Sequence, residues 1–310
     1  MLRWLTARVL GAVGVVLATI LLCSALIATF VPGEAPRPGL WAGTLDGARL
    51  KVAHFDFGIS SVEPGAVPVA TLFRRGVVVD VELLAGGLVA GTVLGILGGR
   101  WCASRPRSTL AHTLDALASI ALCMPVYVAG YALLTLFAPS FGALAHVHGW
   151  LEPGRYEPLT ANPWHWFEAM LVPWLLVGLP IAGIALRLTA AGTLENLDAP
   201  FIQTARAIGT PRRRLLAAAA RPTYGTTAAG LGTQVRILVF NVMLIEYVFF
   251  LPGFFWFTKR AIGNDPPRYI VPDINTLAGV AIWSSVLVVT LSLLADLLTV
   301  VLDPRVYTRS

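Results

Sequence analysis

The sequence has few charged residues. Only 13% of its 310 residues are Asp, Glu, Lys or Arg, and 56% are hydrophobic, whereas a soluble domain carries about 25% charged residues. This deficit disfavours a soluble globular domain and indicates a protein that lies in lipid. The net charge of +6 comes from arginines in short segments between apolar runs, where such residues orient a membrane protein. We therefore expect no nucleic-acid partner.

Cysteine is also scarce. The three cysteines lie far apart, in or beside apolar runs: Cys23, Cys102 and Cys123. This placement matches neither a disulfide framework nor a zinc-binding spacing. Three histidines fall in one expected external loop: His146, His148 and His165. The carboxylates of that loop, Glu152 and Glu157, lack a metal-ligand spacing, so we expect solvated or interfacial histidines and no metal site.

Lysine is nearly absent. The two lysines, Lys51 and Lys259, do not follow a glycine-rich loop, whereas a phosphate-binding P-loop needs the pattern G-x-x-x-x-G-K-[ST] to hold phosphates with backbone amides and the lysine. No Ser, His and Asp arrangement indicates a membrane enzyme either. We expect no catalytic residue and no cofactor, and we expect any ATP hydrolysis to take place on another chain.

Long apolar runs dominate the chain. Crossing the hydrocarbon core takes roughly 20 apolar residues per helix, because backbone polar groups in lipid must be satisfied within the segment. Six runs meet this requirement, at about residues 9–31, 76–99, 113–138, 168–188, 225–250 and 276–302. The first is longer than the roughly 7 to 15 apolar residues of a secretory signal, so we expect it to be retained. The sequence predicts an all-α polytopic membrane protein with six transmembrane helices in a single domain, 1–310.

Arginines between the runs predict the orientation, because short cytoplasmic loops hold an excess of Lys and Arg. The arginine-rich segments fall on one side: Arg3 and Arg8, then Arg100, Arg105 and Arg107, then Arg206, Arg212, Arg213, Arg214 and Arg221, and finally Arg305 and Arg309. The opposite loops are longer and poorer in positive charge per residue, although seven basic residues in them reduce the contrast: Arg37, Arg49, Lys51, Arg74, Arg75, Lys259 and Arg260. Both termini are therefore expected in the cytoplasm.

Glycines recur every four residues along the second run: Gly87, Gly91, Gly95 and Gly99. Such a ridge lets helix backbones approach closely, since packing rather than the hydrophobic effect drives helix association in lipid. We expect a packing role for these glycines rather than a ligand role.

A polar segment, residues 195–222, separates the fourth and fifth runs. Asp198 is a candidate N-cap with Pro200 in the first turn of a helix. Four residues at helical spacing predict one apolar face on it: Phe201, Ile202, Ala205 and Ile208. Gly209 is expected to end this helix in a left-handed conformation.

A second short helix follows that turn. Pro211 starts it, the basic residues Arg212, Arg213 and Arg214 lie in its first turn, and Pro222 ends or kinks it. The segment therefore predicts a helix, a sharp turn and a helix on the cytoplasmic side. An amphipathic helix lying on anionic lipid is the alternative interpretation.

Ionisable residues at membrane depth indicate a transport pathway by default, since they are costly in lipid. The candidates for a pathway or gate, together with one polar residue, are Asp80, Glu82, Arg236, Asn241 and Glu246. The alternative is structural, with Glu82 and Glu246 pairing with an arginine or capping a broken helix. The residues alone leave both interpretations open.

The order of residues in segment 195–222 resembles the EAA loop of ATP-driven (ABC) importer permeases, whose pattern is E-A-A, three residues, Gly, nine residues and I-x-L-P. Here the pattern reads Gln203-Thr204-Ala205, then Gly209, and then Ala219-Ala220-Arg221-Pro222. The glutamate is replaced by Gln203, and the Ile and Leu positions also differ.

The resemblance is sharper to the dipeptide, oligopeptide and nickel branch of these permeases, where the loop reads D-[YF]-[IV]-x-T-A-R-A-x-G. Seven residues match in place: Phe201, Ile202, Thr204, Ala205, Arg206, Ala207 and Gly209. Ala199 and Pro200 stand between Asp198 and the aromatic residue. Four other stretches agree in the right order: Val31-Pro32-Gly33, Asp56-Phe57-Gly58-x-Ser60, Glu246-x-Val248-Phe249-x-x-Pro252-Gly253 and Leu302-Asp303-Pro304-Arg305. The chain departs from the family at Glu34-Ala35-Pro36 and in a shorter first external loop.

This resemblance implies a transmembrane permease subunit (the B-type permease) of an ATP-driven importer for peptides or related small solutes, in the bacterial inner membrane. It implies two ATP-binding subunits, a second homologous permease and an external substrate-binding protein as partners. The residues that it assigns to ATPase coupling are Asp198, Phe201, Gln203, Thr204, Ala205, Arg206, Gly209 and Arg212. The helix-turn-helix around Gly209 would sit in a groove on an ATPase and convert its closure into rigid-body motion of the spans. The sequence does not specify whether the cargo is a dipeptide, a longer peptide or a nickel chelate.

The alternative function is that of a secondary transporter, or of another polytopic membrane protein, without ATPase partners. A secondary transporter needs coupling carboxylates near the midplane and often has paired interrupted helices in two halves. No such repeat is visible in this sequence, and its carboxylates lie toward one face.

Overall fold

The computed structural model describes residues 2–30, 40–63, 65–139, 142, 151–263 and 272–302. Several features named above lie outside these residues: the stretch Val31-Pro32-Gly33, Glu34-Ala35-Pro36, His146, His148 and residues 303–310. The side chain of Arg236 also lies outside the description.

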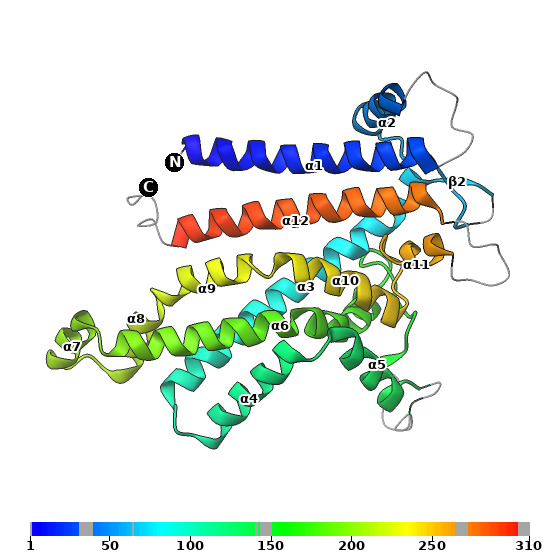
Figure 1. The fold of residues 1–310 in the computed structure, drawn as a ribbon. Helices are drawn as coiled ribbons and strands as arrows, with labels where there is room; N and C mark the ends of the chain where they lie inside the picture. Colours follow the sequence, from blue (N-terminus) through cyan, green and yellow to red (C-terminus); the bar gives the residue numbers. More distant parts are fainter. Residues whose placement is uncertain are drawn as a thin grey trace. The chain divides into compact units, whose positions relative to one another are not determined.

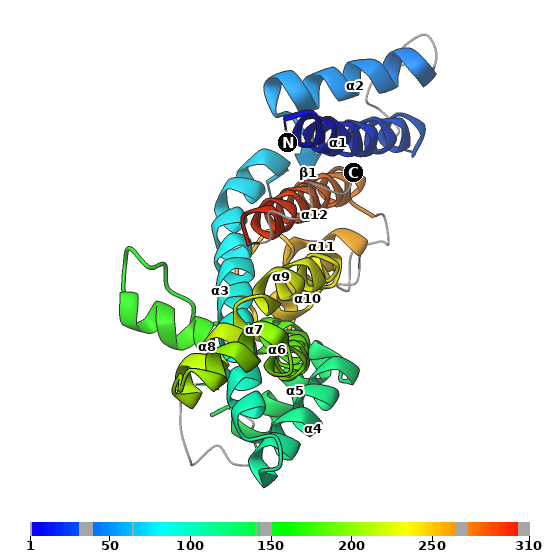
Figure 2. The same cartoon turned by 90° about the vertical axis from the view of Figure 1, so that its left-hand side faces the viewer.

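The described chain is almost entirely helical (Figure 1). Its helices are α1 (Leu2–Phe30), α2 (Leu40–His54), α3 (Val69–Ser104), α4 (Thr109–Cys123), α5 (Val126–Phe137), α6 (Pro163–Leu197), α7 (Pro200–Ala207), α8 (Arg212–Ala220), α9 (Thr223–Gly232), α10 (Val235–Phe249), α11 (Phe257–Ile262) and α12 (Ile274–Leu302). One antiparallel hairpin pairs β1 (Ile59–Ser60) with β2 (Val67–Pro68). α2 packs on α1 (Figure 2), in a region treated above as an external loop. The predicted all-α fold class is confirmed.

Four helices are long and apolar enough to cross a membrane by themselves: Thr6–Thr29 within α1, Val69–Ser104, Pro163–Leu197 and Ile274–Val301 within α12. They correspond to the runs predicted at 9–31, 76–99, 168–188 and 276–302. Two further spans result if each of two bent helix pairs counts as one. The described residues therefore form a multi-pass membrane protein with four to six candidate spans.

The run at 113–138 does not form one continuous helix. α4 and α5 meet at an angle of 107°, and Met124 and Pro125 between them are extended, with ψ of 124° and 128°. Pro125 is the physical reason, since it has no N–H to donate and disfavours a helical backbone at the residue before it. The run at 225–250 is also divided, and its two parts are bent by 63°.

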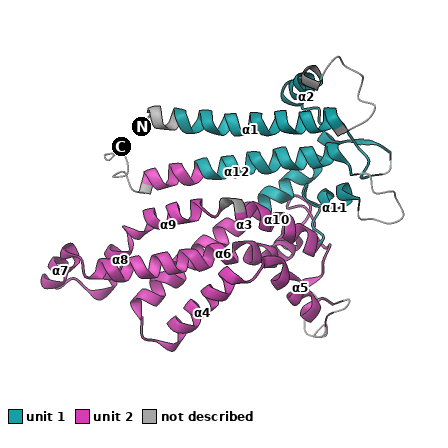
Figure 3. Ribbon diagram, viewed as in Figure 1, with its two compact units in different colours: residues 1–82, 250–293 teal, residues 83–249, 294–310 magenta. Residues whose placement is uncertain are grey.

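The chain forms two compact units (Figure 3). Unit 1 comprises residues 1–82 and 250–293, and unit 2 comprises residues 83–249 and 294–310. Both α3 and α12 contribute residues to each unit. The single domain over residues 1–310 remains a prediction.

A buried carboxylate joins three segments of unit 1. Asp80 is completely buried. Its Oδ1 accepts a hydrogen bond from the Phe254 backbone N–H at 2.7 Å, and its Oδ2 accepts one from Trp283 Nε1 at 2.6 Å. Because a buried charge is costly unless it is hydrogen-bonded, these two bonds fix α3, the loop after α10 and α12 against one another.

The Asp56-Phe57-Gly58-x-Ser60 stretch is tied to the start of α12 in the same unit. Gly58 has φ of 85°, and its N–H donates to Asp56 Oδ1 at 2.9 Å. The buried Ser60 hydroxyl donates to Asp273 Oδ2 at 2.7 Å, and the Thr276 hydroxyl donates to the same oxygen at 2.9 Å. The motif therefore folds into a tight turn that packs on α12.

The glycine ridge on α3 packs against α6 within unit 2. Gly91 lies against the backbone of Gly178, and a methyl group at Gly95 would come within 2.6 Å of the Ala182 carbonyl oxygen. Any side chain at these positions would therefore force the two helices apart. The packing role predicted for the ridge is confirmed.

We expect Gly91→Leu to lower the free energy of unfolding by about 3 kcal/mol or more, because the added side chain overfills the contact with α6. Gly14→Leu on α1 is the control, since a Cβ atom there meets nothing within 4 Å; it should change the free energy by less than about 0.5 kcal/mol. Thermal unfolding of the detergent-solubilised protein, followed by size-exclusion chromatography, measures both. Equal unfolding midpoints for the two variants would show that α3 and α6 do not require close backbone contact.

Candidate coupling segment and pathway residues

The segment between α6 and α9 lies at one end of unit 2 (Figure 3). α6 ends at Leu197, α7 covers Pro200–Ala207, and α8 covers Arg212–Ala220. The helix, turn and helix expected within residues 195–222 are therefore present.

α7 packs on α8 through a small apolar core. Ile202 is completely buried against Leu215 and Ala219, with Ala205 packed beside them. Asn196, in the last turn of α6, donates from Nδ2 to the Ala219 carbonyl at 2.9 Å. The end of α6, α7 and α8 are thus held together by apolar packing and one side-chain hydrogen bond.

Gly209 forms the turn between α7 and α8, with φ of 81°. Its N–H donates to the Arg206 carbonyl at 3.0 Å, and the Thr210 N–H donates to the Ala205 carbonyl at 3.1 Å. These two bonds form a Schellman motif, which ends a helix at a left-handed residue. A Cβ atom at Gly209 would meet nothing within 4 Å, so backbone conformation rather than space favours glycine here. The left-handed conformation predicted for Gly209 is confirmed.

Asp198 does not cap α7. It is the C-cap residue of α6, with φ of −93° and ψ of −1°, and Ala199 precedes α7 without any side-chain capping bond. The N-cap prediction was wrong because Pro200 takes the first position of α7, which moves the cap to the residue directly before it. The Asp198 backbone carbonyl instead accepts a hydrogen bond from Gln203 Nε2 at 2.9 Å, and the Thr204 hydroxyl donates to the Pro200 carbonyl at 3.0 Å.

The outer face of α7, which we define as Phe201 and the C-cap residue Ile208, is exposed, and Arg206 is exposed as well. Phe201 is 51% exposed and Ile208 is 79% exposed, and a spacing of seven residues puts both on one side of the helix. The single apolar face predicted above therefore divides, because Ile202 points inward to α8. Large apolar side chains exposed on a polar segment indicate a contact surface.

Arg212 links this segment to the end of α3. Its Nη2 donates to the Ser104 carbonyl at 2.8 Å, and the neighbouring Arg105 guanidinium lies 5.8 Å from the ring centre of Trp101. Two arginine-rich stretches that the sequence analysis assigned to one side of the membrane therefore lie at the same end of unit 2.

The pathway candidates occur in both units. Glu82, on α3, is half-buried and is the last residue of the 1–82 segment of unit 1. In unit 2, Asn241 is 6% exposed and Glu246 is completely buried, and both lie on α10. Complete burial of a carboxylate in a membrane protein keeps Glu246 a pathway candidate. Asp80, in contrast, has a structural role, because its two oxygens accept the hydrogen bonds described above.

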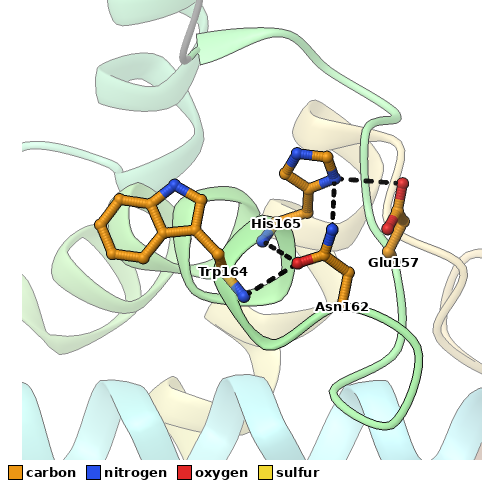
Figure 4. Close-up of polar contacts among 4 residues, drawn as sticks. All are labelled: Glu157, Asn162, Trp164 and His165. Carbon is orange, nitrogen blue, oxygen red and sulfur yellow. Dashed lines mark hydrogen bonds and ion pairs between the residues drawn. The ribbon is translucent and has the colours of Figure 1, made fainter.

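His165 belongs to the start of α6 (Figure 4). Asn162 caps this helix, since its Oδ1 accepts hydrogen bonds from the backbone N–H groups of Trp164 at 3.1 Å and His165 at 3.2 Å. The His165 Nδ1 atom lies 3.1 Å from Asn162 Nδ2 and 3.2 Å from Glu157 Oε1. The part of the chain that the structure describes contains no group of three or more His, Cys, Asp or Glu side chains that could hold a metal ion.

The sequence analysis did not identify an ion pair within unit 2. Arg187 on α6 donates from Nε to Asp115 Oδ1 on α4 at 3.1 Å, and its guanidinium also contacts the Ser119 hydroxyl. Arg187 and Asp115 border a pocket of about 330 Å³ that Cys102 and His112 also line. A charged residue inside an apolar run was the available signal, because Arg187 falls within 168–188 and Asp115 within 113–138.

Comparison with known proteins identifies the family. Residues 91–307, which include α7, α8 and α10, match the model described as "Binding-protein-dependent transport system inner membrane component". The chain is similar to a putative peptide transport system permease protein of Brucella suis, at 25% identity over 82% of this chain and 76% of the relative. It is also similar to the oligopeptide transport system permease protein OppB of Mycobacterium tuberculosis, at 29% identity over 77% of this chain and 73% of the relative. Because the family match covers more than half of this chain, the chain belongs to the family of binding-protein-dependent transport system inner membrane components.

Proposed function

We propose that this chain is the transmembrane permease subunit of an ATP-driven importer for peptides or related small solutes. The outer face of α7 is the observation that carries the proposal. Phe201 and Ile208 are 51% and 79% exposed on a segment rich in arginine, and such a surface fits an apolar groove with an acidic rim on an ATP-hydrolysing partner. The burial of Ile202 leaves these two side chains available for that contact.

The packing of unit 2 suggests how coupling would work. α7 is fixed to α8 by the Ile202 core, and Asn196 ties α8 to the end of α6. A partner that displaces α7 would therefore move α8 and the end of α6 with it. Since α6 packs on α3 along the glycine ridge, this displacement would reach the spans as rigid-body motion, which is the basis of alternating access.

The proposed cargo and partners rest on the family and on the names of the relatives. Both relatives described above are named as peptide or oligopeptide permeases. We propose two ATP-binding subunits, a second homologous permease and an external substrate-binding protein as partners, with ATP hydrolysis on the ATP-binding subunits. We place the chain in the bacterial inner membrane with both termini in the cytoplasm.

Cysteine-accessibility labelling tests this orientation. In a background without Cys23, Cys102 and Cys123, cysteines at Arg105 and Arg213 should react only from the cytoplasmic side, and a cysteine at Glu152 should react only from the outside. The reason is the excess of arginine in short cytoplasmic loops. Labelling of position 213 from the outside would exclude an ATPase contact at α7.

Gly209→Val should uncouple ATP hydrolysis from transport. The left-handed backbone at this position costs a residue with a side chain roughly 1–2 kcal/mol, and a β-branched residue is among the least tolerant. The substitution should therefore extend α7 or redirect α8 and displace the outer face of α7. We expect transport by the purified complex in nanodiscs to fall by at least about tenfold, which corresponds to a loss of roughly 1.4 kcal/mol.

Gly209→Asn is the matched control for this experiment. Asparagine is similar in size to valine but adopts the left-handed conformation more readily, so this variant should retain most of the transport activity. Insertion into the membrane should be unchanged in both variants. Normal ATPase copurification together with normal transport in Gly209→Val would leave the amphipathic surface helix as the better interpretation of α7.

Glu246→Ala should reduce transport by about tenfold or more without reducing the amount of assembled complex. The motive is the complete burial of this carboxylate in α10, together with the default functional role of ionisable groups at membrane depth. Transport by Asn241→Ala, which changes the other described pathway candidate on α10, is measured beside it. Transport rates in proteoliposomes, normalised to the complex recovered, measure the effect. Loss of the complex itself would assign Glu246 a structural role instead.

A further inference from the structure

Unit 1 contains an apolar cavity of about 140 Å³. The side chains that enclose it include four phenylalanines, the indole of α12 and an aliphatic residue one helical turn further: Phe55, Phe57, Phe73, Phe254, Trp283 and Val286. The lining side chains are hydrocarbon apart from the Trp283 N–H, which donates to Asp80 at 2.6 Å. The lining side chains therefore select an apolar guest.

Phe73 holds the aromatic lining in place. Its ring lies edge-on to the rings of Phe55, Phe254 and Trp283, with centroid distances of 5.3, 5.3 and 5.1 Å. Edge-to-face contacts of this kind are favourable and directional. The walls of the cavity are thus fixed by aromatic contacts and by the Asp80 hydrogen bond, and the cavity is a built feature of unit 1.

Phe55 forms the mouth of the cavity. Its side chain is 40% exposed, and its backbone has φ of 54°, a left-handed conformation that bulky residues rarely adopt. The ring is held in this position by an edge-to-face contact with Phe57 at 4.8 Å. A strained residue at the rim of a pocket indicates a functional constraint on the rim.

The size of the cavity identifies the part of a guest that it can hold. An engineered apolar cavity of roughly 150 Å³ accommodates a benzene molecule. The cavity in unit 1 therefore has room for a short hydrocarbon segment and not for a whole lipid or a peptide. The rest of such a guest would extend out through the mouth at Phe55.

A cationic residue, Arg74, lies next in sequence to the cavity-lining Phe73 and could meet the headgroup of a bound lipid. Arg74 is exposed. It shares one side of α3 with Val78 and Val81, which are 55% and 43% exposed, because residues four and seven positions apart face the same way. An arginine at the end of an exposed apolar stripe marks the boundary between headgroups and hydrocarbon, and its charge complements a phosphate.

We propose that this cavity holds the end of one acyl chain of a membrane phospholipid whose phosphate contacts Arg74. The apolar lining selects the chain, and the arginine fixes the headgroup at the membrane surface. The acyl chain would fill the cavity between the aromatic side chains of α3, α12 and the loop after α10. It would thereby stabilise unit 1.

Native mass spectrometry of the intact complex, extracted in a mild detergent, tests the proposal. The complex should retain one tightly bound phospholipid. Val286→Phe, which fills the cavity, should remove it, whereas Leu294→Phe, at a position of α12 that is 55% exposed, should not. Arg74→Gln should lower the lipid occupancy by about fivefold, the effect of one arginine at an anionic surface, and Arg49→Gln on α2 is its charge-matched control.

Electron cryo-microscopy of the complex in nanodiscs with dibrominated acyl chains locates the lipid directly. Bromine scattering should appear within the cavity in the wild type and disappear in Val286→Phe. Val286→Phe could fail to fold. Arg74→Gln still tests the proposal in that case, because it leaves the aromatic side chains of the cavity unchanged. A side chain of another subunit in the cavity, or wild-type lipid retention in Arg74→Gln, would overturn it.

Discussion

The backbone contact between α3 and α6 is the constraint on which the arrangement of unit 2 depends. In lipid, no hydrophobic force pulls two apolar helices together, so close packing has to supply the attraction. The glycines of α3 allow this packing because the Gly178 backbone and the Ala182 carbonyl occupy the space that their side chains would fill. α4, α5, α8, α9 and α10 all pack on α6 in turn. The position of α6, once set by the ridge, therefore places most of the unit.

Unit 1 uses polar contacts where unit 2 uses glycine. Asp80 and Asp273 are both buried carboxylates that accept hydrogen bonds from distant parts of the chain. Such groups are costly in an apolar environment unless donors satisfy them, and for this reason each one admits few arrangements of its neighbours. The Asp80 bond to Trp283 also fixes one wall of the aromatic cavity. Structural specificity and the proposed lipid site thus depend on the same carboxylate.

Features that depend on local sequence were predictable. The ridge follows from a four-residue period, and the left-handed turn follows from a single glycine after a helical pattern. The bend at Met124 and Pro125 was missed because a count of apolar residues does not register the effect of proline on its predecessor. The partners of Asp80 were not predictable, since Phe254 and Trp283 are 174 and 203 residues away along the chain. The inward direction of Ile202 was not predictable either. The hydrophobic periodicity of α7 shows which residues are apolar, but it does not show which of them α8 covers.

The division of the α7 apolar residues allows one short helix to pack on its own chain and also to serve the proposed ATPase contact. A helix of eight residues is too short to be stable alone, so part of its surface has to pack on its own chain. Ile202 provides that contact with Leu215 and Ala219, and the Schellman turn at Gly209 sets the direction of α8 without using a side chain. Phe201 and Ile208 then remain on the outside. Because Asn196 links α8 to α6, the proposed ATPase contact at the outer residues would act on the helix that organises unit 2.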